Sequence, residues 1–268
     1  MTQQGLSGTL ARLRNVFDDP LFVRVPHGVS PTPFAEMIYP KVISAIEGLK
    51  SLTQIEAFDP STLDSTFCIA TSDYALSVVI QPLFRQLRRI SPNLRIAIVP
   101  LKIELLPHQM RSGQVDLALT VPQFLPANLH SETLFSDHYK CAFRKGHPLA
   151  TKKLTIDEFC KVEHLLVAPN GDDMRSATDT VLEQHGRTRR VGIAVPSFLV
   201  ARSLLATTDL LGILPSRLFK DTSDYLFITD PPINIPSFEI ISVWSERSNA
   251  DPINTWIREL LRVLVGDR

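Results

Sequence analysis

The strongest constraint in this sequence is an alternation, starting at residue 66, of short apolar runs with longer stretches of helical periodicity. The apolar runs 66–70, 94–100 and 115–121 are separated by the stretches 72–90 and 103–112, where apolar residues recur at three- and four-residue spacing. Strands that are apolar along their whole length belong to parallel sheets covered by helices on both faces. We therefore predict an α/β fold with the order strand–helix–strand–helix–strand.

A second set of apolar runs starts near Leu134 and repeats this layout. It indicates a second α/β half, followed by a last strand after Pro231-Pro232 and a closing helix with an apolar face. The predicted strands of this part are 134–144, 164–168, 189–195, 210–214 and 238–244, and its helices are 156–161, 173–185, 198–206 and 252–265.

The first 33 residues have a different pattern, which is typical of one helix followed by a hairpin. Apolar residues at Leu6, Leu10, Leu13 and Phe17 form a helical stripe, and the following Asp-Asp-Pro ends the helix. A β-branched run at 21–25 and the turn Pro26-His27-Gly28 predict a short hairpin. Helix, stop and hairpin form the second half of a winged helix-turn-helix. The candidate DNA contacts are Gln3, Ser7, Thr9, Arg12, Arg14, Arg24 and His27, whose alternative role is a solvated helix face.

Residues 32–52 are predicted to form a single helix, capped by Thr32 and starting at Pro33. Two sets of apolar residues lie seven apart and offset by three, which is typical of a short coiled-coil seam. Pro40 is expected to kink this helix, and an ordinary amphipathic helix packed on its own domain is the alternative. The polar stretch 53–65 is expected to be a linker. The predicted dimerisation residues are Ile38, Val42, Ala45, Leu49 and Leu52.

Composition narrows the classes of function. Lysines plus arginines equal aspartates plus glutamates at 28 each, which argues against a non-specific nucleic-acid coat and leaves room for a small DNA-binding module. Residues 1–31 carry a net charge of only +1, so the DNA-binding interpretation depends on the pattern. Cys68, Cys141 and Cys160 have neither metal-ligand nor disulfide spacing. Without a signal segment or a long apolar run, we expect a cytoplasmic protein with no membrane partner, metal or cofactor.

Four stretches of this sequence resemble the LysR-type transcriptional regulators, in the branch that includes nodulation and aromatic-degradation regulators. The most specific is LARLRNVFDDPLFVRVPHGVSPTP at 10–33, which resembles that family's recognition-helix end and wing. The others are RKGHPLA at 144–150, VPSFLVA at 195–201 and GILPSRL at 212–218, and the resemblance covers essentially the whole chain.

The resemblance implies a winged helix-turn-helix, a dimerising linker helix and a two-subdomain effector module with a periplasmic-binding-protein-like fold. It places crossings between the subdomains near Leu134 and Ser237 and a small inducer in the cleft between them. That family carries about two further helices before its reading helix, whereas Met1 falls just before it here, so a fragment, a misassigned start and a defective DNA-binding module all stay open. The expected segments are 1–31 (recognition helix and wing), 32–52 (linker helix), 53–65 (linker) and 66–268 (effector domain), with subdomain I at 66–134 and 239–268 and subdomain II at 135–238.

Inducer contacts are expected where predicted strands end, because open α/β sheets bind ligands at the carboxyl ends of strands and near helix N-termini. Ser72 has an equal claim to be a helix N-cap, and Phe198 to be a core aromatic. The expected effector-binding residues are Ser72, Asp73, Leu101, Thr120, Pro169, Asn170, Pro196, Ser197 and Phe198.

These features together predict a transcriptional regulator that binds double-stranded promoter DNA as a homodimer or tetramer and responds to a small inducer, an aromatic or a carboxylate compound. Two alternatives are a regulator-like small-molecule-binding protein that has lost DNA binding and a cytoplasmic solute-binding module. A hydrolase or transferase is disfavoured because the nucleophile-elbow, phosphate-loop, dinucleotide and zinc-protease motifs are all missing from the sequence. We therefore expect no catalytic residues.

Overall fold

The computed structural model describes residues 3–26, 28–53, 58–150, 153–169, 174–220 and 225–266. It divides into two compact units, Met1–Phe58 and Asp59–Arg268, each of which is described by itself. Within the described ranges, no helix combines the length and the apolar character that a membrane span requires.

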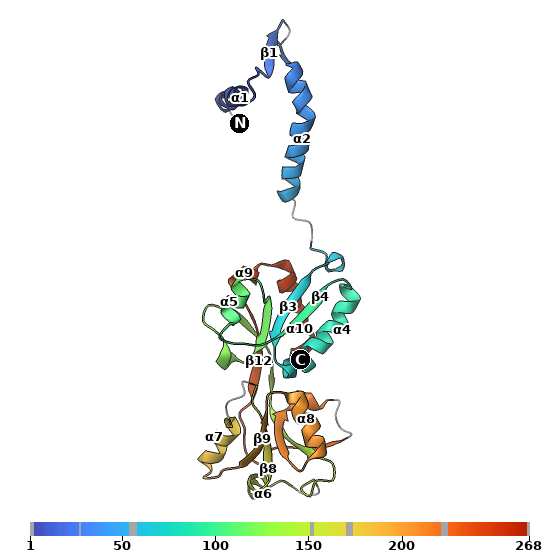
Figure 1. The fold of residues 1–268 in the computed structure, drawn as a ribbon, viewed down its shortest axis with the longest axis vertical. Helices are drawn as coiled ribbons and strands as arrows, with labels where there is room; N and C mark the ends of the chain where they lie inside the picture. The colour runs from blue at the N-terminus through green and yellow to red at the C-terminus, as the bar shows by residue number, and fades with distance from the viewer. Residues whose placement is uncertain are drawn as a thin grey trace. The chain divides into compact units, whose positions relative to one another are not determined.

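The first unit contains the predicted helix, hairpin and second helix (Figure 1). Helix α1 (Gln3–Phe17) ends where Asp18 takes a left-handed conformation with φ 49°. Strands β1 (Phe22–Val25) and β2 (Gly28–Pro31) pair antiparallel, and α2 (Pro33–Thr53) follows with Pro40 inside it. The predicted helix stop and hairpin are confirmed.

A small clasp joins the end of α1 to the start of α2. Asp19 Oδ1 accepts hydrogen bonds from Leu21 N at 2.6 Å and from Thr32 Oγ1 at 2.7 Å. Thr32 Oγ1 in turn accepts from Ala35 N at 3.1 Å, so Thr32 is the predicted N-cap of α2. Because Leu21 and Thr32 are both buried, the clasp fixes how the wing leaves the two helices.

The second unit contains two five-stranded sheets, each of which forms one subdomain (Figure 1). In the first sheet, with the order β4-β3-β5-β12-β6, β3 pairs parallel with β4 and β5, and β12 runs antiparallel to β5 and β6. In the second sheet, with the order β11-β7-β10-β8-β9, β8 pairs parallel with β9 and β10, and β7 runs antiparallel to β10 and β11. The strands are β3 (Thr66–Thr71), β4 (Arg95–Pro100), β5 (Leu117–Thr120), β6 (His130–Asp137), β7 (Tyr139–Arg144), β8 (Glu163–Val167), β9 (Arg190–Val195), β10 (Leu211–Pro215), β11 (Leu226–Thr229) and β12 (Phe238–Trp244).

Three predictions about this unit were wrong. The run 134–144 is not one strand, since β6 and β7 lie in different sheets and the chain crosses between subdomains at His138 rather than at Leu134. Residues 135–137 and Phe238, which were assigned to subdomain II, therefore belong to the first sheet. Both sheets are also mixed rather than parallel, and β11 was not predicted. The run contains Asp137, but the sequence pattern does not reveal that this carboxylate is buried at a crossing between the two sheets.

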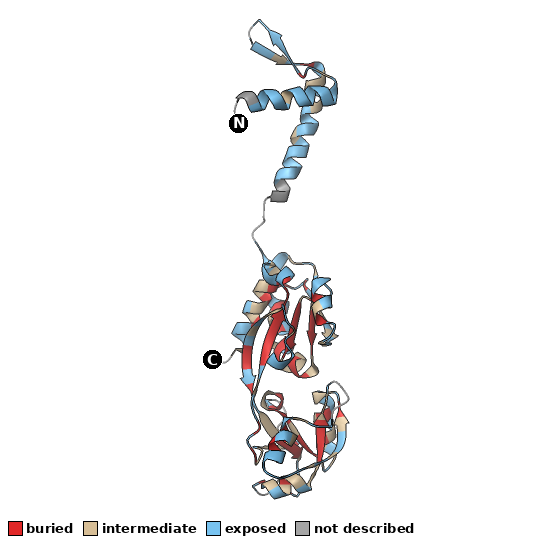
Figure 2. Ribbon diagram, turned by 90° about the vertical axis from the view of Figure 1, so that its left-hand side faces the viewer, coloured by how far each residue is buried: buried red, intermediate tan, exposed pale blue. Residues whose placement is uncertain are grey.

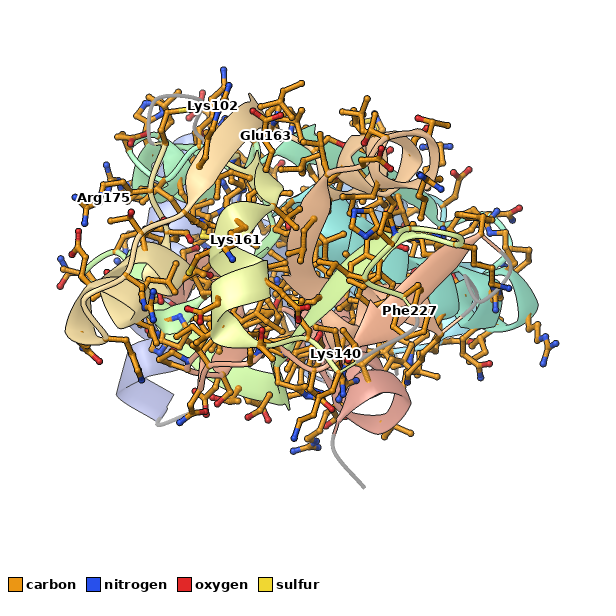
Figure 3. All side chains as sticks on the ribbon, turned by 90° about the horizontal axis from the view of Figure 1, so that it is seen from below. Lys102, Lys140, Lys161, Glu163, Arg175 and Phe227 are labelled. Atoms are coloured by element: carbon orange, nitrogen blue, oxygen red, sulfur yellow. The ribbon has the colours of Figure 1, made fainter. Side chains whose placement is uncertain are left out.

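Helices cover the sheets, with α8 against β7 to β10 and α10 against α4 and β6. Figure 2 shows the buried residues concentrated in the strands, and one apolar cluster continues from Leu83 and Phe135 of the first subdomain to Leu165 and Leu205 of the second. Figure 3 shows the end of the second subdomain, with Lys161 on α6 and Glu163 at the start of β8. The helices are α3 (Asp73–Ala75), which runs through a π-helical turn into α4 (Gln81–Ile90), then α5 (Leu106–Arg111), α6 (Ile156–Lys161), α7 (Ala177–Gln184), α8 (Phe198–Thr207), α9 (Glu246–Asn249) and α10 (Pro252–Val265).

Candidate DNA-binding and effector-binding sites

The polar face of α1 is the candidate DNA-reading surface. Ser7, Thr9 and Arg12 are exposed on it, and Arg24 is exposed on the wing strand β1. Gln3 lies in the first turn of α1, although its side chain, like the whole of His27, lies outside the described residues. The hydroxyl of Thr9 donates locally to Gly5 O at 2.9 Å.

Arg14, predicted as a phosphate contact, has a structural role in this unit. Its Nε donates to Pro20 O at 2.7 Å and its Nη2 to Phe22 O at 3.3 Å. These bonds tie α1 to the base of the wing. The side chain therefore positions the hairpin relative to α1.

Apolar side chains of both helices are exposed in this unit. Leu6 is 58% exposed and Leu49 is 65% exposed, whereas Phe17 packs against Phe34 with ring centroids 5.9 Å apart. Among the predicted dimerisation residues, Val42, Ala45 and Leu49 are exposed and Ile38 is half-buried. Leu52 lies in α2, but its side chain is outside the described residues. The predicted seam is therefore presented on α2 as an apolar surface.

In the second unit the structure brings Asp73 and Ser197 together across the subdomains. Ser197 Oγ donates to Asp73 Oδ2 at 2.6 Å, and Leu199 N donates to the same oxygen at 3.1 Å. Asp73 therefore caps the first turn of α8 from the opposite subdomain, beside Ser197, the N-cap of that helix. Ser72 is the N-cap of α3, the alternative role that the sequence left open.

The other predicted effector residues are scattered. Thr120 is buried at the end of β5 and Leu101 is half-buried, whereas Pro169 and Pro196 are exposed. Asn170 lies outside the described residues. Among the described ones, Phe198 is the predicted residue that lines a cavity.

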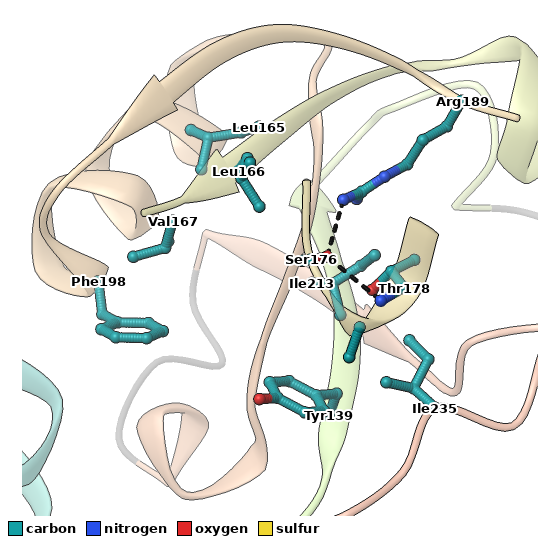
Figure 4. A pocket seen from close by; sticks show the side chains of 11 residues that line it. Tyr139, Leu165, Leu166, Val167, Ser176, Thr178, Arg189, Phe198, Ile213 and Ile235 are labelled. Atoms are coloured by element: carbon teal, nitrogen blue, oxygen red, sulfur yellow. Dashed lines mark hydrogen bonds between the residues drawn. The ribbon is translucent and has the colours of Figure 1, made fainter. Parts of the chain in front are cut away.

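That cavity, of about 90 Å³, lies in the second subdomain at the carboxyl end of β8 and the N-termini of α7 and α8 (Figure 4). Its apolar wall includes two aromatic rings, those of Tyr139 and Phe198. Its position agrees with the rule that open α/β sheets bind ligands beyond the carboxyl ends of their strands. The lining residues are Tyr139, Leu165, Leu166, Val167, Ser176, Ala177, Thr178, Arg189, Phe198, Ile213 and Ile235.

The polar side chains on one wall of this cavity form hydrogen bonds with one another and with Asp179. Arg189, whose side chain is 1% exposed, donates from Nε and Nη2 to the two carboxylate oxygens of Asp179 at 2.8 Å each. Arg189 Nη2 also donates to Ser176 Oγ at 3.0 Å, which accepts from Thr178 N at 3.2 Å (Figure 4). Burial alone would raise the pKa of Asp179, but the hydrogen bonds and charge of Arg189 outweigh burial and lower it.

Behind Arg189 lies a fully buried imidazole. The Nε2–H of His164 donates to Phe159 O at 2.7 Å, and its Nδ1 accepts from Arg189 Nη1 at 3.3 Å. Burial first, and then the charge of Arg189, lower the pKa of His164 to about 4. His164 is therefore neutral at pH 7 and joins α6, β8 and the polar wall.

Aromatic rings connect the cavity to the first subdomain. Phe198 packs against Tyr74 with centroids 5.8 Å apart, and Tyr139 against Phe238 at 5.0 Å. Tyr74 and Phe238 also meet, at 5.9 Å. Tyr74, Tyr139 and Phe238 were not predicted, because no spacing links three aromatics so far apart in the chain. The position of Tyr74 in a predicted first helical turn was the one available signal.

The described residues contain no group of three or more histidine, cysteine, aspartate or glutamate side chains that could hold a metal ion. The candidate effector site is therefore an apolar cavity with aromatic walls and a polar side whose groups are satisfied by one another.

Comparison with known proteins bears on both units. The family model described as "LysR substrate binding domain" matches residues 61–264. The HTH-type transcriptional activator NagR of a Ralstonia species is 33% identical over 271 residues, covering 100% of this chain and 89% of that protein. The HTH-type transcriptional activator NahR of Pseudomonas putida is 32% identical over 270 residues, covering 100% and 90%. A crystal structure of a probable transcriptional regulator from Pseudomonas aeruginosa is similar with a TM-score of 0.69 and 25% identity, covering 100% of this chain and 90% of that one.

Proposed function

The chain belongs to the LysR-type family of transcriptional regulators, and on that premise we propose that its effector is a small, ring-shaped, largely apolar molecule that binds against Tyr139 and Phe198. The protein is a DNA-binding transcriptional regulator that responds to a small molecule between its two α/β subdomains. The cavity adjoins that interface, because Phe198 lines it and also packs against Tyr74 of the first subdomain. This cavity is the observation that supports the proposal.

The size and chemistry of the cavity favour this class of effector. Its volume of about 90 Å³ is below the ~300 Å³ at which drug-sized ligand pockets begin, so it accommodates at most a single small ring without rearrangement. Arg189, Ser176 and Asp179 satisfy one another, so the deep part of the site offers apolar contact rather than spare donors. A carboxylate on the effector would point out of the cavity, toward the subdomain interface.

A filling substitution tests the site without emptying the core. Ala177, exposed at the first position of α7, lines the cavity, so the larger side chain of Ala177→Leu should occupy part of it. With benzoate, a small aromatic carboxylate, as the probe ligand, Ala177→Leu should weaken binding at least tenfold. Thr180→Leu, at an exposed position of the same helix, is the matched control. Titration calorimetry on the full chain measures both. Equal affinities of the two variants and the unmodified chain would rule out this cavity.

We also propose how the other partners bind. The exposed polar face of α1 and the wing contact promoter DNA through Gln3, Ser7, Thr9, Arg12, Arg14, Arg24 and His27. Two copies associate through Ile38, Val42, Ala45, Leu49 and Leu52 of α2, as a homodimer or as a tetramer of such dimers. Because its target is chromosomal DNA, we place the protein in the cytoplasm.

A further inference from the structure

The four rings around the cavity form a continuous path between the subdomains. Phe198 and Tyr139 line the cavity, and each packs against a ring that does not: Phe198 against Tyr74 at 5.8 Å, and Tyr139 against Phe238 at 5.0 Å. Tyr74 and Phe238 complete the path at 5.9 Å. Closely packed rings move together, because the interior has no spare space. A ligand that displaces Phe198 therefore presses on Tyr74 directly, and one that displaces Tyr139 acts on Tyr74 through Phe238.

Within this path, Tyr74 contacts a buried carboxylate. Its hydroxyl donates to Asp137 Oδ2 at 2.5 Å, and both residues are less than 4% exposed. Burial, followed by this hydrogen bond, raises the pKa of Tyr74, so the phenol remains a donor over the whole working pH range. The bond is directional, and a movement of the ring changes its geometry.

Asp137 is the last residue of β6, directly before the chain crosses into the second subdomain. Oδ1 of Asp137 accepts from Ser216 Oγ at 2.5 Å and from His138 N at 2.7 Å, and Oδ2 accepts from Arg217 N at 3.2 Å. Ser216 and Arg217 follow β10 of the second sheet. Arg217 also reaches back, donating to Val265 O at 3.2 Å. One carboxylate therefore joins Tyr74, the crossing and the second subdomain.

We propose that Tyr74 is a positioning residue that couples occupancy of the cavity to the relative orientation of the two subdomains, through its hydrogen bond to Asp137. A ligand against Phe198 and Tyr139 shifts the Tyr74 ring, which alters its bond to Asp137 and so changes how that carboxylate holds Ser216 and Arg217. The ligand site itself depends on the function proposed above. The coupling is a separate property of the four rings and the carboxylate.

The decisive variant is Tyr74→Phe, which removes the hydroxyl and keeps the ring. Tyr225→Phe, which removes the exposed hydroxyl that accepts from Arg202, is the matched control. In the full chain, benzoate should bind Tyr74→Phe within about twofold of the unmodified protein. The change in amide exchange that benzoate causes at His138 and Arg217 should be lost in Tyr74→Phe and kept in Tyr225→Phe. An undiminished change in Tyr74→Phe would overturn the coupling.

An experiment without ligand tests the coupling independently of where the effector binds. Phe198→Leu removes the cavity ring and should accelerate exchange at the amides of His138 and Arg217 by about fivefold in the unmodified background. In the Tyr74→Phe background the same substitution should have little effect. If benzoate fails to bind but this non-additivity is found, the effector site is wrong and the coupling stands. If Phe198→Leu has equal effects in both backgrounds, the coupling is refuted even where benzoate binds.

Discussion

Among single residues, His164 combines complete burial with a pKa of about 4, against an ordinary value of 6.5. The unfolded chain therefore binds more protons than the folded chain between these two pH values. It follows that the free energy of unfolding rises with pH in this window, and that the contribution is lost as pH falls from 6.5 toward 4.

We predict that this single histidine reduces the free energy of unfolding by about 2–3 kcal/mol between pH 7 and pH 4. Urea unfolding at pH 7 and at pH 4 gives the change in the free energy of unfolding for the unmodified chain and for His164→Gln. The difference between these two changes is the contribution of His164. His138→Gln, at an exposed histidine, is the control. The same pH dependence in His164→Gln and the unmodified chain would contradict the assignment.

Arg12 and Ser7 are two proposed DNA contacts at which the DNA-binding proposal can be tested. Arg12→Ala should weaken binding to the DNA adjoining the gene and lower the slope of log affinity against log salt by about 1, because one phosphate contact is lost. Ser7→Ala should instead relax discrimination between sequences. Gel-shift titrations at several salt concentrations measure both effects, with Lys41→Ala on α2 as the control. If Arg12→Ala leaves the slope of log affinity against log salt unchanged, Arg12 does not contact a DNA phosphate.

At the scale of elements, the clearest open surface is the apolar side of α2. A charge in a seam between two helices would be desolvated and unpaired, so Val42→Asp should dissociate the proposed dimer. Ser44→Asp places the same charge about 200° further round the helix and should leave the dimer intact. Light scattering after size exclusion measures the mass of each variant. A Val42→Asp protein with the dimer mass would show that α2 pairs through another face.

The sequence predicted elements well where local chemistry is decisive. Thr32 and Pro33 mark the start of α2, and the Asp-Asp-Pro stop marks the end of α1, because caps and proline act on the backbone next to them. It failed at Asp137, because whether the run 134–144 forms one strand or two depends on Ser216 and Arg217, which are distant in the chain. The missing strand β11 has the same cause, since its partner β7 determines it.

At the scale of the whole molecule, the family and the fold class were predictable, and the cavity was not. The ends of the predicted strands pointed to the region of the cavity, and Phe198, which lines it, was included for that reason. Several other cavity residues are apolar residues of β8 and β10, whose patterns show only that they are buried, and the polar ones, Ser176, Thr178 and Arg189, share no spacing that groups them. Asp73 and Ser197 were chosen as ligand contacts, and in the structure they bond to each other. Which polar groups remain available to a ligand depends on the tertiary pairing.

The most direct test of the central claim is to measure nuclear Overhauser effects between bound benzoate and this chain with its methyl groups labelled. If the effector site is the cavity beside Tyr139 and Phe198, the ring protons of benzoate will show contacts to the methyl groups of Ile213, Ile235 and Val167. Ala177→Leu will abolish these contacts. Saturable binding with contacts to methyl groups elsewhere, or no binding at millimolar benzoate, would contradict the account.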